Sequence, residues 1–351
     1  MSERGPGYDG FLLLSFGGPE GIDDVLPFLR NVTRGRGVPE ERLAAVAEHY
    51  RHFDGVSPIN EQNRALLAAL RTEFAGHGID LPLYWGNRNW DPYLADTLAR
   101  MRDDGVRRAI AFVTSPFGSY SSCRQYLDDI LAARRAVGAG APVVDKLRHF
   151  HDHPGYVGPH ADAVRAALGR LRSVDPAHTR LVFTAHSVPT SMARTAGPDG
   201  NRYTDQLAEL AGLVVAGAGA TDIPYDLVWQ SRSGPPQVPW LEPDVNDHLT
   251  RLRADGVTGV VVSPIGFVSD HLEVVWDLDN EAADTARRLG LDYARAATPG
   301  TDPRFVSMVR ELVEERRDPA VPRRRLGRLP VWDVCPADCC PAPRRPASPR
   351  D

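Results

Sequence analysis

The segment VVVSPIGFVSDHLEVVWDLDNEAA, residues 260–283, decides the fold class of this chain. It opens with three consecutive valines, as expected of a strand buried on both faces of a parallel sheet. Pro264 and Gly266 are predicted to end that strand. A histidine and several carboxylates follow at once. Because open α/β sheets bind their ligands beyond the carboxyl ends of the strands, this polar cluster is a candidate functional site.

The acidic residues of this segment have a helical spacing. Glu273, Asp277 and Glu281 stand four residues apart, so a helix over 273–289 would carry them on one face. The plain alternative is a solvated acidic face, which is what charge runs usually form. The position directly after an apolar strand favours a site.

Length and composition limit the class of protein. A chain of 351 residues fits about two domains of ~150 residues each. The net charge of −5 gives no positive field, so no nucleic-acid partner is expected. No stretch approaches the ~20 apolar residues of a membrane span. The first ten residues lack the apolar core of a signal peptide, and we expect a cytoplasmic protein.

Apolar strands alternate with helical patterns along the whole chain, which is typical of doubly wound α/β folds. The predicted strands are Phe11–Ser15, Leu81–Trp85, Ala109–Thr114, Leu181–Ala185, Tyr225–Gln230 and Gly259–Pro264. Residues 110–126 resemble residues 260–276 at an offset of 150, which indicates an internal repeat. The predicted fold is therefore two similar Rossmann-like, doubly wound parallel-sheet domains flanking a cleft, although any two βα units look alike.

The repeat also divides the chain and pairs its residues. We predict an N-terminal half over 1–153, a C-terminal half over 154–318, and an extension with a low-complexity tail over 319–351. In the repeat Phe16 falls opposite His186, and Cys123 falls opposite Glu273.

His186 is the first candidate for chemistry, because it directly follows an apolar strand and its unperturbed pKa lies near 6.5. His271 and Glu273 are candidate partners, and Asp270 is expected to orient His271. Histidine and carboxylate ligands together suit a divalent metal such as Fe(II), Co(II) or Zn(II). The sequence contains no H-E-x-x-H, no G-x-S-x-G and no P-loop, which argues against a zinc protease, a serine hydrolase and a nucleotide site.

Six segments together resemble the ferrochelatase family over roughly residues 10–315. They are LLLSFGGPE (12–20), GVSPINEQN (55–63), YWGNRNWDPY (84–93), FTAHSVP (183–189), LVWQSRSGPPQVPWLEP (227–243) and GFVSDHLEVVWDLDNEA (266–282). The resemblance implies a lyase of haem biosynthesis that inserts ferrous iron into a porphyrin.

The resemblance also implies roles for single residues. His186 and Glu273 would face each other at the metal site, with Asp270 and His271 in support. Asp277 and Glu281 would pass iron in or protons out. Porphyrin contacts carry over by position to Phe16, Thr33, Arg34, His49, Tyr50, Ser57 and Tyr126. Many bacterial relatives have tyrosine at the Phe16 position; phenylalanine can stack on the macrocycle but cannot ligate iron.

The four cysteines, Cys123, Cys335, Cys339 and Cys340, resemble the [2Fe–2S] ligands of some ferrochelatases, including actinobacterial ones. Such a cluster would pin the C-terminal segment to the first half. The alternative is a disordered tail with adventitious thiols.

The substrate stays open between two porphyrins. Soluble relatives from Gram-positive bacteria generally use coproporphyrin III, and the Arg-rich composition favours such a source, so coproheme is the expected product. Its four propionates would meet Arg34, Arg36, Arg88 and Arg124. The alternatives are a protoporphyrin IX ferrochelatase, a cobalt chelatase and a non-catalytic tetrapyrrole-binding protein. We expect a monomer that takes porphyrin and ferrous iron and hands its product transiently to the next haem-pathway enzyme.

Overall fold

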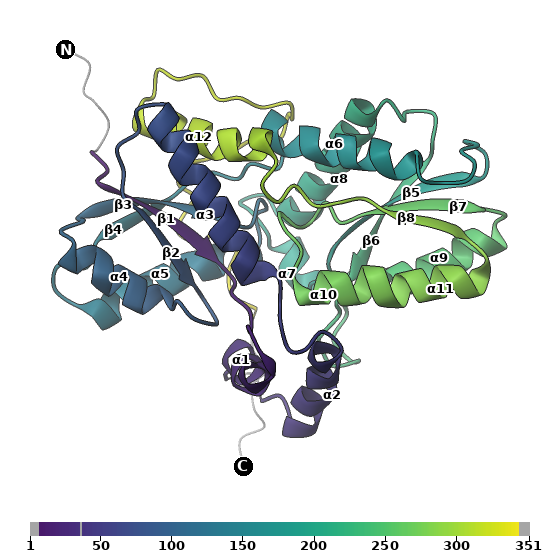
Figure 1. The fold of residues 1–351 in the computed structure, drawn as a ribbon, viewed down its shortest axis with the longest axis horizontal. Helices are drawn as coiled ribbons and strands as arrows, with labels where there is room; N and C mark the ends of the chain where they lie inside the picture. Colours follow the sequence, from purple (N-terminus) through teal and green to yellow (C-terminus); the bar gives the residue numbers. More distant parts are fainter. Residues whose placement is uncertain (1–6, 36, 344–351) are drawn as a thin grey trace.

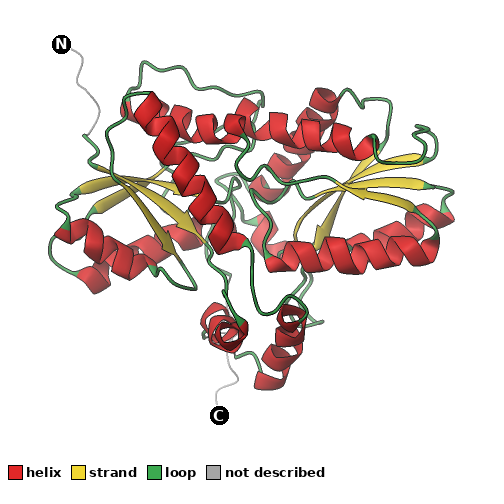
Figure 2. Ribbon diagram, in the orientation of Figure 1, coloured by secondary structure: helices red, strands yellow, loops and turns green. Residues whose placement is uncertain are grey.

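The computed structural model describes residues 7–35 and 37–343 and contains two four-stranded parallel sheets with helices on both sides (Figures 1 and 2). The first sheet has the order β2-β1-β3-β4 and the second the order β6-β5-β7-β8. The strands are β1 (Gly10–Ser15), β2 (Leu83–Asn87), β3 (Arg108–Val113), β4 (Val143–Lys146), β5 (Thr179–His186), β6 (Tyr225–Gln230), β7 (Gly259–Ser263) and β8 (Asp292–Arg295). The two orders are equivalent, which confirms the predicted fold of two similar halves.

The apolar strands form the centre of each sheet. Every residue of β1 and of β7 is buried, because helices cover both faces. β7 ends at Ser263, directly before Pro264. All six predicted strands are present, and β2 begins two residues later than predicted. The edge strands β4 and β8 were missed, because only one residue of each is buried and their sequences, VVDK and DYAR, lack a continuous apolar pattern.

The described helices include short 3-10 and π segments. They are η1 (Ile22–Asp24), α1 (Val25–Val32), α2 (Glu40–Arg51), α3 (Ile59–Gly76), α4 (Leu94–Asp103), η2 (Tyr120–Arg124), α5 (Gln125–Val137), α6 (Pro154–Leu168), α7 (Thr190–Arg194), α8 (Arg202–Ala218), α9 (Val245–Ala254), α10 (Leu272–Val274), η3 (Val275–Ala282), α11 (Ala283–Leu289) and α12 (Pro303–Arg317). The predicted helix over 273–289 is thus interrupted by the π-helical segment η3. The first half carries a π-helical segment, η2, after its own third strand. π turns are frequent at functional sites.

Three helices connect the halves. α1 and α2 lie below the two sheets in the view of Figure 1, and their apolar residues pack with Leu272 of α10. The helix α12 was not predicted, and it returns to the first half after the second sheet is complete. Its Phe305 ring lies 6.0 Å from that of Phe112 in β3, and its Arg310 forms an ion pair with Glu73 of α3 at 2.8 Å. One continuous apolar core therefore includes residues of both sheets.

Candidate functional site

His186 is the last residue of β5 and pairs with Gln230, the last residue of β6. The Nδ1 atom of His186 lies 2.5 Å from the carbonyl oxygen of Ser187. The Tyr203 hydroxyl donates a hydrogen bond to the backbone carbonyl of His186 at 2.9 Å. A neutral imidazole that donates Nδ1–H to Ser187 keeps its Nε2 lone pair as an acceptor or metal ligand. The fold therefore fixes this ring at the carboxyl edge of the second sheet.

Glu273 reaches the same edge through the loop after β7. The Gly266 N–H donates to the Thr184 carbonyl of β5 at 3.0 Å. A Cβ atom on Gly266 would lie 2.6 Å from the Ala185 Cβ, so the close approach of the loop to β5 requires glycine. The side chain of Glu273 is partly buried, and burial raises its pKa to about 7.

Asp277 connects the edge of the sheet to Glu273. Its carboxylate accepts hydrogen bonds from the Gln230 amide at 3.1 Å and from the Ser231 hydroxyl. Burial, together with repulsion from Glu273 and from Glu281, raises the pKa of Asp277 to about 7. Glu281 is exposed at the outer end of this line and accepts a bond from Trp276 Nε1 at 3.0 Å. The three carboxyls thus run from the interior to the surface.

Two neighbouring polar residues, His271 and Asp270, were expected to support the site. His271 lies near His186, and burial with repulsion from His186 lowers the pKa of His271 to about 4, so the ring is neutral at pH 7. Asp270 accepts hydrogen bonds from Arg295 and, at 3.2 Å, from Thr298. Within the described residues Asp270 forms no hydrogen bond with His271, although its negative charge acts on His271 and opposes the fall of the His271 pKa.

Aromatic side chains of the first half face this edge. Burial and the nearby charge of Glu273 raise the pKa of the Tyr50 phenol well above its usual range. The His49 ring of α2 stacks on Trp276 of η3, with centroids 4.2 Å apart and planes 9° from parallel. Phe16, which follows β1, is 36% exposed and packs edge-on against Phe28. Of these rings, Tyr50 interacts with Glu273 and His49 contacts Trp276 of the segment that carries the carboxyls.

The other predicted porphyrin contacts differ in accessibility. Arg34 is exposed, and Thr33 is half-buried. The Thr33 hydroxyl donates a hydrogen bond to the Leu29 carbonyl at 2.7 Å. Ser57 and Tyr126 are buried in this conformation, with their side chains shielded from solvent.

All three described arginines expected at the porphyrin rim already form hydrogen bonds, and Arg34 donates to the side-chain oxygen of Asn31 at 2.5 Å. Arg88 pairs with Asp129 at 2.5 Å and stacks over Tyr126, and Arg124 donates to the Ala337 carbonyl at 2.5 Å. The expectation that both are free for propionates is therefore wrong for this conformation. Arg36 lies outside the described residues.

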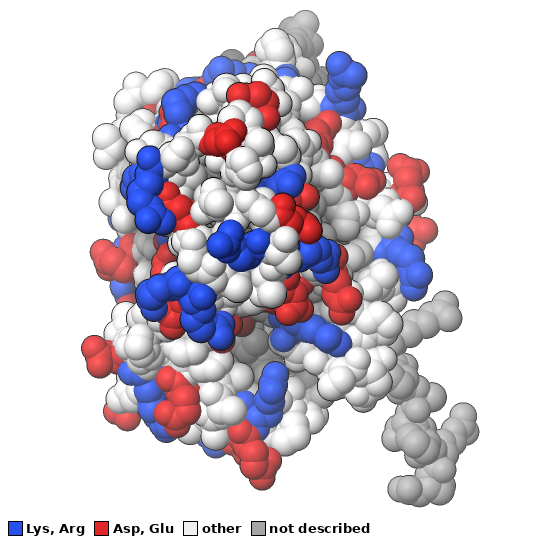
Figure 3. All heavy atoms as spheres, turned by 90° about the vertical axis from the view of Figure 1, so that its right-hand side faces the viewer, with Lys and Arg blue, Asp and Glu red and all other residues white. Residues whose placement is uncertain are grey.

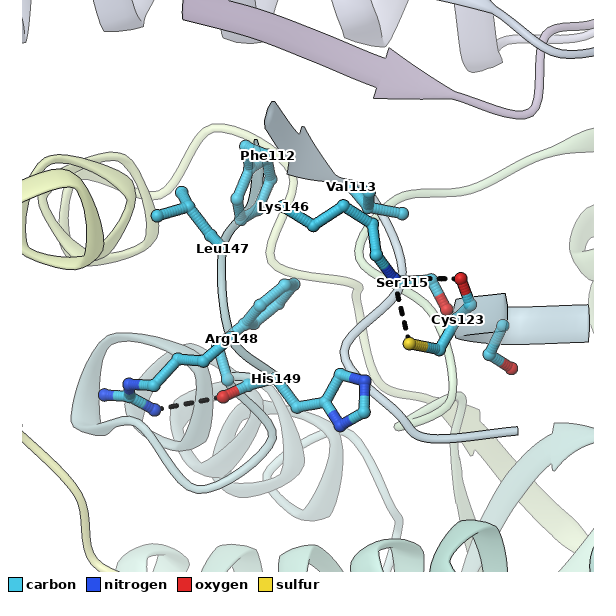
Figure 4. A pocket seen from close by; sticks show the side chains of 10 residues that line it. Phe112, Val113, Ser115, Cys123, Lys146, Leu147, Arg148 and His149 are labelled. Carbon is cyan, nitrogen blue, oxygen red and sulfur yellow. Dashed lines mark hydrogen bonds between the residues drawn. The ribbon is translucent and has the colours of Figure 1, made fainter. Parts of the chain in front are cut away.

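The four cysteines converge although Cys123 is more than 200 residues from the others. All four are free thiols. The sulfurs of Cys339 and Cys340 lie 3.5 Å apart. The neighbouring Cys335 thiol, with the positive charges of His149 and Lys146, holds the pKa of Cys123 well below its usual range. Figure 4 shows Lys146 and His149 beside Cys123 in a pocket between β3, β4 and η2.

The C-terminal segment that carries three of these thiols contacts both halves. Arg124, at the end of η2, binds the Ala337 carbonyl, while the Gly197 N–H of the second half donates to Cys340 Sγ at 3.1 Å. Arg202 of α8 stacks on Trp332 at 4.6 Å. The prediction placed this segment against the first half alone, because the sequence repeat gave no sign of contacts with α8.

A cluster missed by sequence reasoning holds the start of this segment. His151, Asp152 and Glu209 have their ligand-type atoms within 4.8 Å of one another. Asp152 already accepts from Arg325 at 2.9 Å, and Glu209 accepts from two backbone N–H groups of residues 328 and 329. We interpret these carboxylates as anchors for the segment and not as a metal site.

The surface and the helices add two observations. On the face of the second half shown in Figure 3, acidic and basic side chains are interspersed. Within residues 7–35 and 37–343, no helix has the length and apolar character needed to cross a bilayer.

Two Rossmann-like halves, with a histidine and partly buried carboxyls at the edge of one sheet, define a chelatase-like class of protein. A family model described as ferrochelatase matches residues 8–317, and the chain belongs to the ferrochelatase family. It is 56% identical over 349 residues to the coproporphyrin III ferrochelatase of Nocardia farcinica, covering 97% of this chain and 98% of that protein. It is 55% identical to the coproporphyrin III ferrochelatase of Streptomyces griseus, covering 95% and 94%.

A solved structure supports the fold alone. The sirohydrochlorin chelatase SirB from Bacillus subtilis subspecies spizizenii, in complex with cobalt, matches 89% of this chain and 96% of its own with a TM-score of 0.50. The sequence identity is 9%, so only the architecture is shared.

Proposed function

We propose that this protein inserts Fe(II) into coproporphyrin III and forms coproheme in haem biosynthesis. One observation carries the proposed site: His186, Gln230 and Asp277 form a continuous polar row at one sheet edge, and Glu273 adjoins it. The names and the high identity of the actinobacterial relatives support coproporphyrin III as the porphyrin.

The proposed chemistry follows from the proton balance. Metal insertion removes two N–H protons from the porphyrin and strips water from Fe(II). The Nε2 atom of His186 would accept a proton or bind the iron. Glu273, with a pKa of about 7, exchanges protons readily near neutral pH. Asp277 and Glu281 would then carry protons outward or iron inward along the row of carboxyls.

The proposed porphyrin contacts lie on the first half. Phe16 and His49 supply flat surface, Tyr50 is buried behind them, and Arg34 supplies an exposed guanidinium for a propionate. Thr33 precedes Arg34 and fixes the end of α1. Two further residues act indirectly in this proposal: the Ser57 N–H holds the Pro19 carbonyl at 2.9 Å, and Tyr126 supports Arg88.

Substrate choice is the first test. We expect a kcat/KM for coproporphyrin III at least ~10-fold above that for protoporphyrin IX, since a hydrogen bond to a charged group contributes about 1.5–3 kcal/mol. Initial rates with both porphyrins, under anaerobic conditions with Fe(II), measure the ratio. Arg34→Met should reduce the ratio, whereas Arg42→Met, an exposed arginine on the same hairpin, should not. Equal rates would favour protoporphyrin IX as an equivalent substrate.

The same assay separates the remaining alternatives. A cobalt chelatase would prefer Co(II) over Fe(II) with the same porphyrin. A non-catalytic tetrapyrrole-binding protein would bind porphyrin tightly and convert none of it.

We also propose a [2Fe–2S] cluster on Cys123, Cys335, Cys339 and Cys340. Four free thiols, arranged as two close pairs, fit a cluster whose two irons each take two thiolates. The cluster would be held by Cys123 of the first half and by the three cysteines of the C-terminal segment. It would therefore supply a rigid link between that segment and the body of the protein.

Removing one thiol is expected to remove the cluster. Cys335→Ser should abolish the reddish-brown absorbance and reduce the content of iron and acid-labile sulfide to background, because the remaining thiols leave one iron incompletely ligated. Asp338→Asn changes an exposed residue of the same loop and should retain both. A wild-type protein without iron and sulfide would contradict the proposal.

Compartment and assembly complete the proposal. Free buried thiols suit a reducing compartment, so we place the reaction in the cytoplasm. The proposed working unit is a monomer that passes its product transiently to the next enzyme of the pathway.

A further inference from the structure

Lys146 is the only lysine of a chain that has 41 lysine and arginine residues. It is the last residue of β4, it is partly buried, and its ammonium lies inside the protein beside Cys123. The Nζ atom is 2.9 Å from Cys123 Sγ and 2.9 Å from the Cys123 carbonyl oxygen (Figure 4). The only lysine of the chain is therefore in direct contact with Cys123, a proposed ligand of the cluster.

The geometry suits an ammonium better than a guanidinium. An ammonium is a compact charge with three donors around one nitrogen, so it can reach a sulfur and a carbonyl of the same residue at once. The guanidinium of arginine spreads its charge over a planar fork and is matched to carboxylates. The bond to the carbonyl also holds the ammonium in place, because that oxygen lies in η2, the segment that positions the sulfur.

The surroundings make this charge effective. Cys123 is buried, so water screens the Lys146–sulfur contact only weakly. The Ser119 hydroxyl accepts from the Ser122 N–H at 3.1 Å and fixes the start of η2. His149 is the other basic side chain that approaches this sulfur, and Arg124 points instead to the C-terminal segment. Lys146 thus places its ammonium group in direct contact with the Cys123 sulfur.

We propose that Lys146 is a positioning residue that raises the reduction potential of the [2Fe–2S] cluster through its charged N–H···S bond to Cys123. The inference rests on the cluster proposed above. One-electron reduction adds a negative charge to the iron pair and breaks no bond. A nearby cation and a hydrogen bond to sulfur stabilise that added charge, and both are known determinants of cluster potentials.

The test measures potential and not turnover. The full-length protein is titrated anaerobically with dithionite, which supplies the electron, and the midpoint potential is read from the visible spectrum with redox mediators. We expect Lys146→Met to disfavour reduction about tenfold, which corresponds to a shift of ~59 mV to lower potential. Lys146→Arg keeps the charge and should recover part of the shift. Arg135→Met removes an exposed charge from α5 in the same half and should leave the potential unchanged.

Each outcome supports or overturns the inference. A Lys146→Met protein that retains its cluster at the wild-type potential overturns it, while the cluster proposal stands. A wild-type protein without iron and sulfide overturns the cluster itself. If Lys146→Met holds no cluster, Lys146→Gln, which keeps a donor without the charge, takes its place in the titration. If Lys146→Arg, which keeps the positive charge, also loses the cluster, then the shape of the lysine side chain decides whether the cluster is held. That result would overturn the proposed role of the charge.

Discussion

Replacing His186 by alanine is expected to lower kcat/KM for iron insertion by ~10²–10⁴-fold, the range that a positioned acid–base group contributes. The Ser187 carbonyl contacts the His186 ring at Nδ1, and the Tyr203 hydroxyl donates to the His186 backbone carbonyl, so both fix this residue at the end of β5. Porphyrin binding should persist, since the aromatic surface belongs to the first half. An anaerobic assay with Fe(II), beside porphyrin fluorescence quenching, measures both quantities.

The control for this variant is another histidine of the second half. His178 is exposed, precedes β5 and pairs with Asp175, so His178→Ala should keep the wild-type rate. Thermal unfolding of both variants checks the fold. Wild-type turnover in His186→Ala would sink the proposed site.

Replacing Glu273 by glutamine is expected to lower the rate by ~10²-fold or more at pH 8 and to change its pH dependence. Burial raises the pKa of Glu273 to about 7, so the carboxyl is protonated below that pH and available as a base above it. The wild-type rate should therefore rise as the pH increases through 7. Asp277 has a similar pKa and interacts with Glu273, so the inflection belongs to the pair.

Glu273→Gln should lose most of that inflection in the pH–rate profile, whereas Asp284→Asn, which changes an exposed carboxyl on α11, should keep it.

The pH dependence of stability gives an independent check on the pKa of Glu273. Folding raises the pKa of Glu273 from 4.5, so the carboxyl costs stability once the pH exceeds 4.5, and the cost is complete above 7. The glutamine variant should gain stability relative to the wild type between these values. An unchanged pH–rate profile in Glu273→Gln would rule out its role as the base.

Much of the architecture could be predicted because it depends on local patterns. Consecutive apolar residues predict β1 and β7, Pro264 predicts the strand end, and a repeat at fixed offset predicts two equivalent sheets. The edge strands β4 and β8 escaped prediction, since partial burial weakens their patterns, whereas α12 was missed although its buried residues have a helical spacing.

The candidate site was only partly predictable. His186 and Glu273 follow apolar strands, so their arrival at one edge follows from parallel topology. The hydrogen bonds of Gln230, the ion pair of Asp270 with Arg295, and the burial of Tyr126 depend on residues distant in the chain. No local pattern encodes such contacts, and the same holds for the convergence of Cys123 with the C-terminal segment.

The return of α12 to the first half has a consequence for how this protein holds together. Phe305 packs among Phe112 and Phe150, although the chain has by then completed the second sheet. Cutting the chain between its two repeats would separate Phe305 from both of these rings and would break the contacts of α12 with α3, leaving α12 with its contacts to α6. The two halves therefore share one apolar core, and each covers part of the surface that the other would otherwise expose to water.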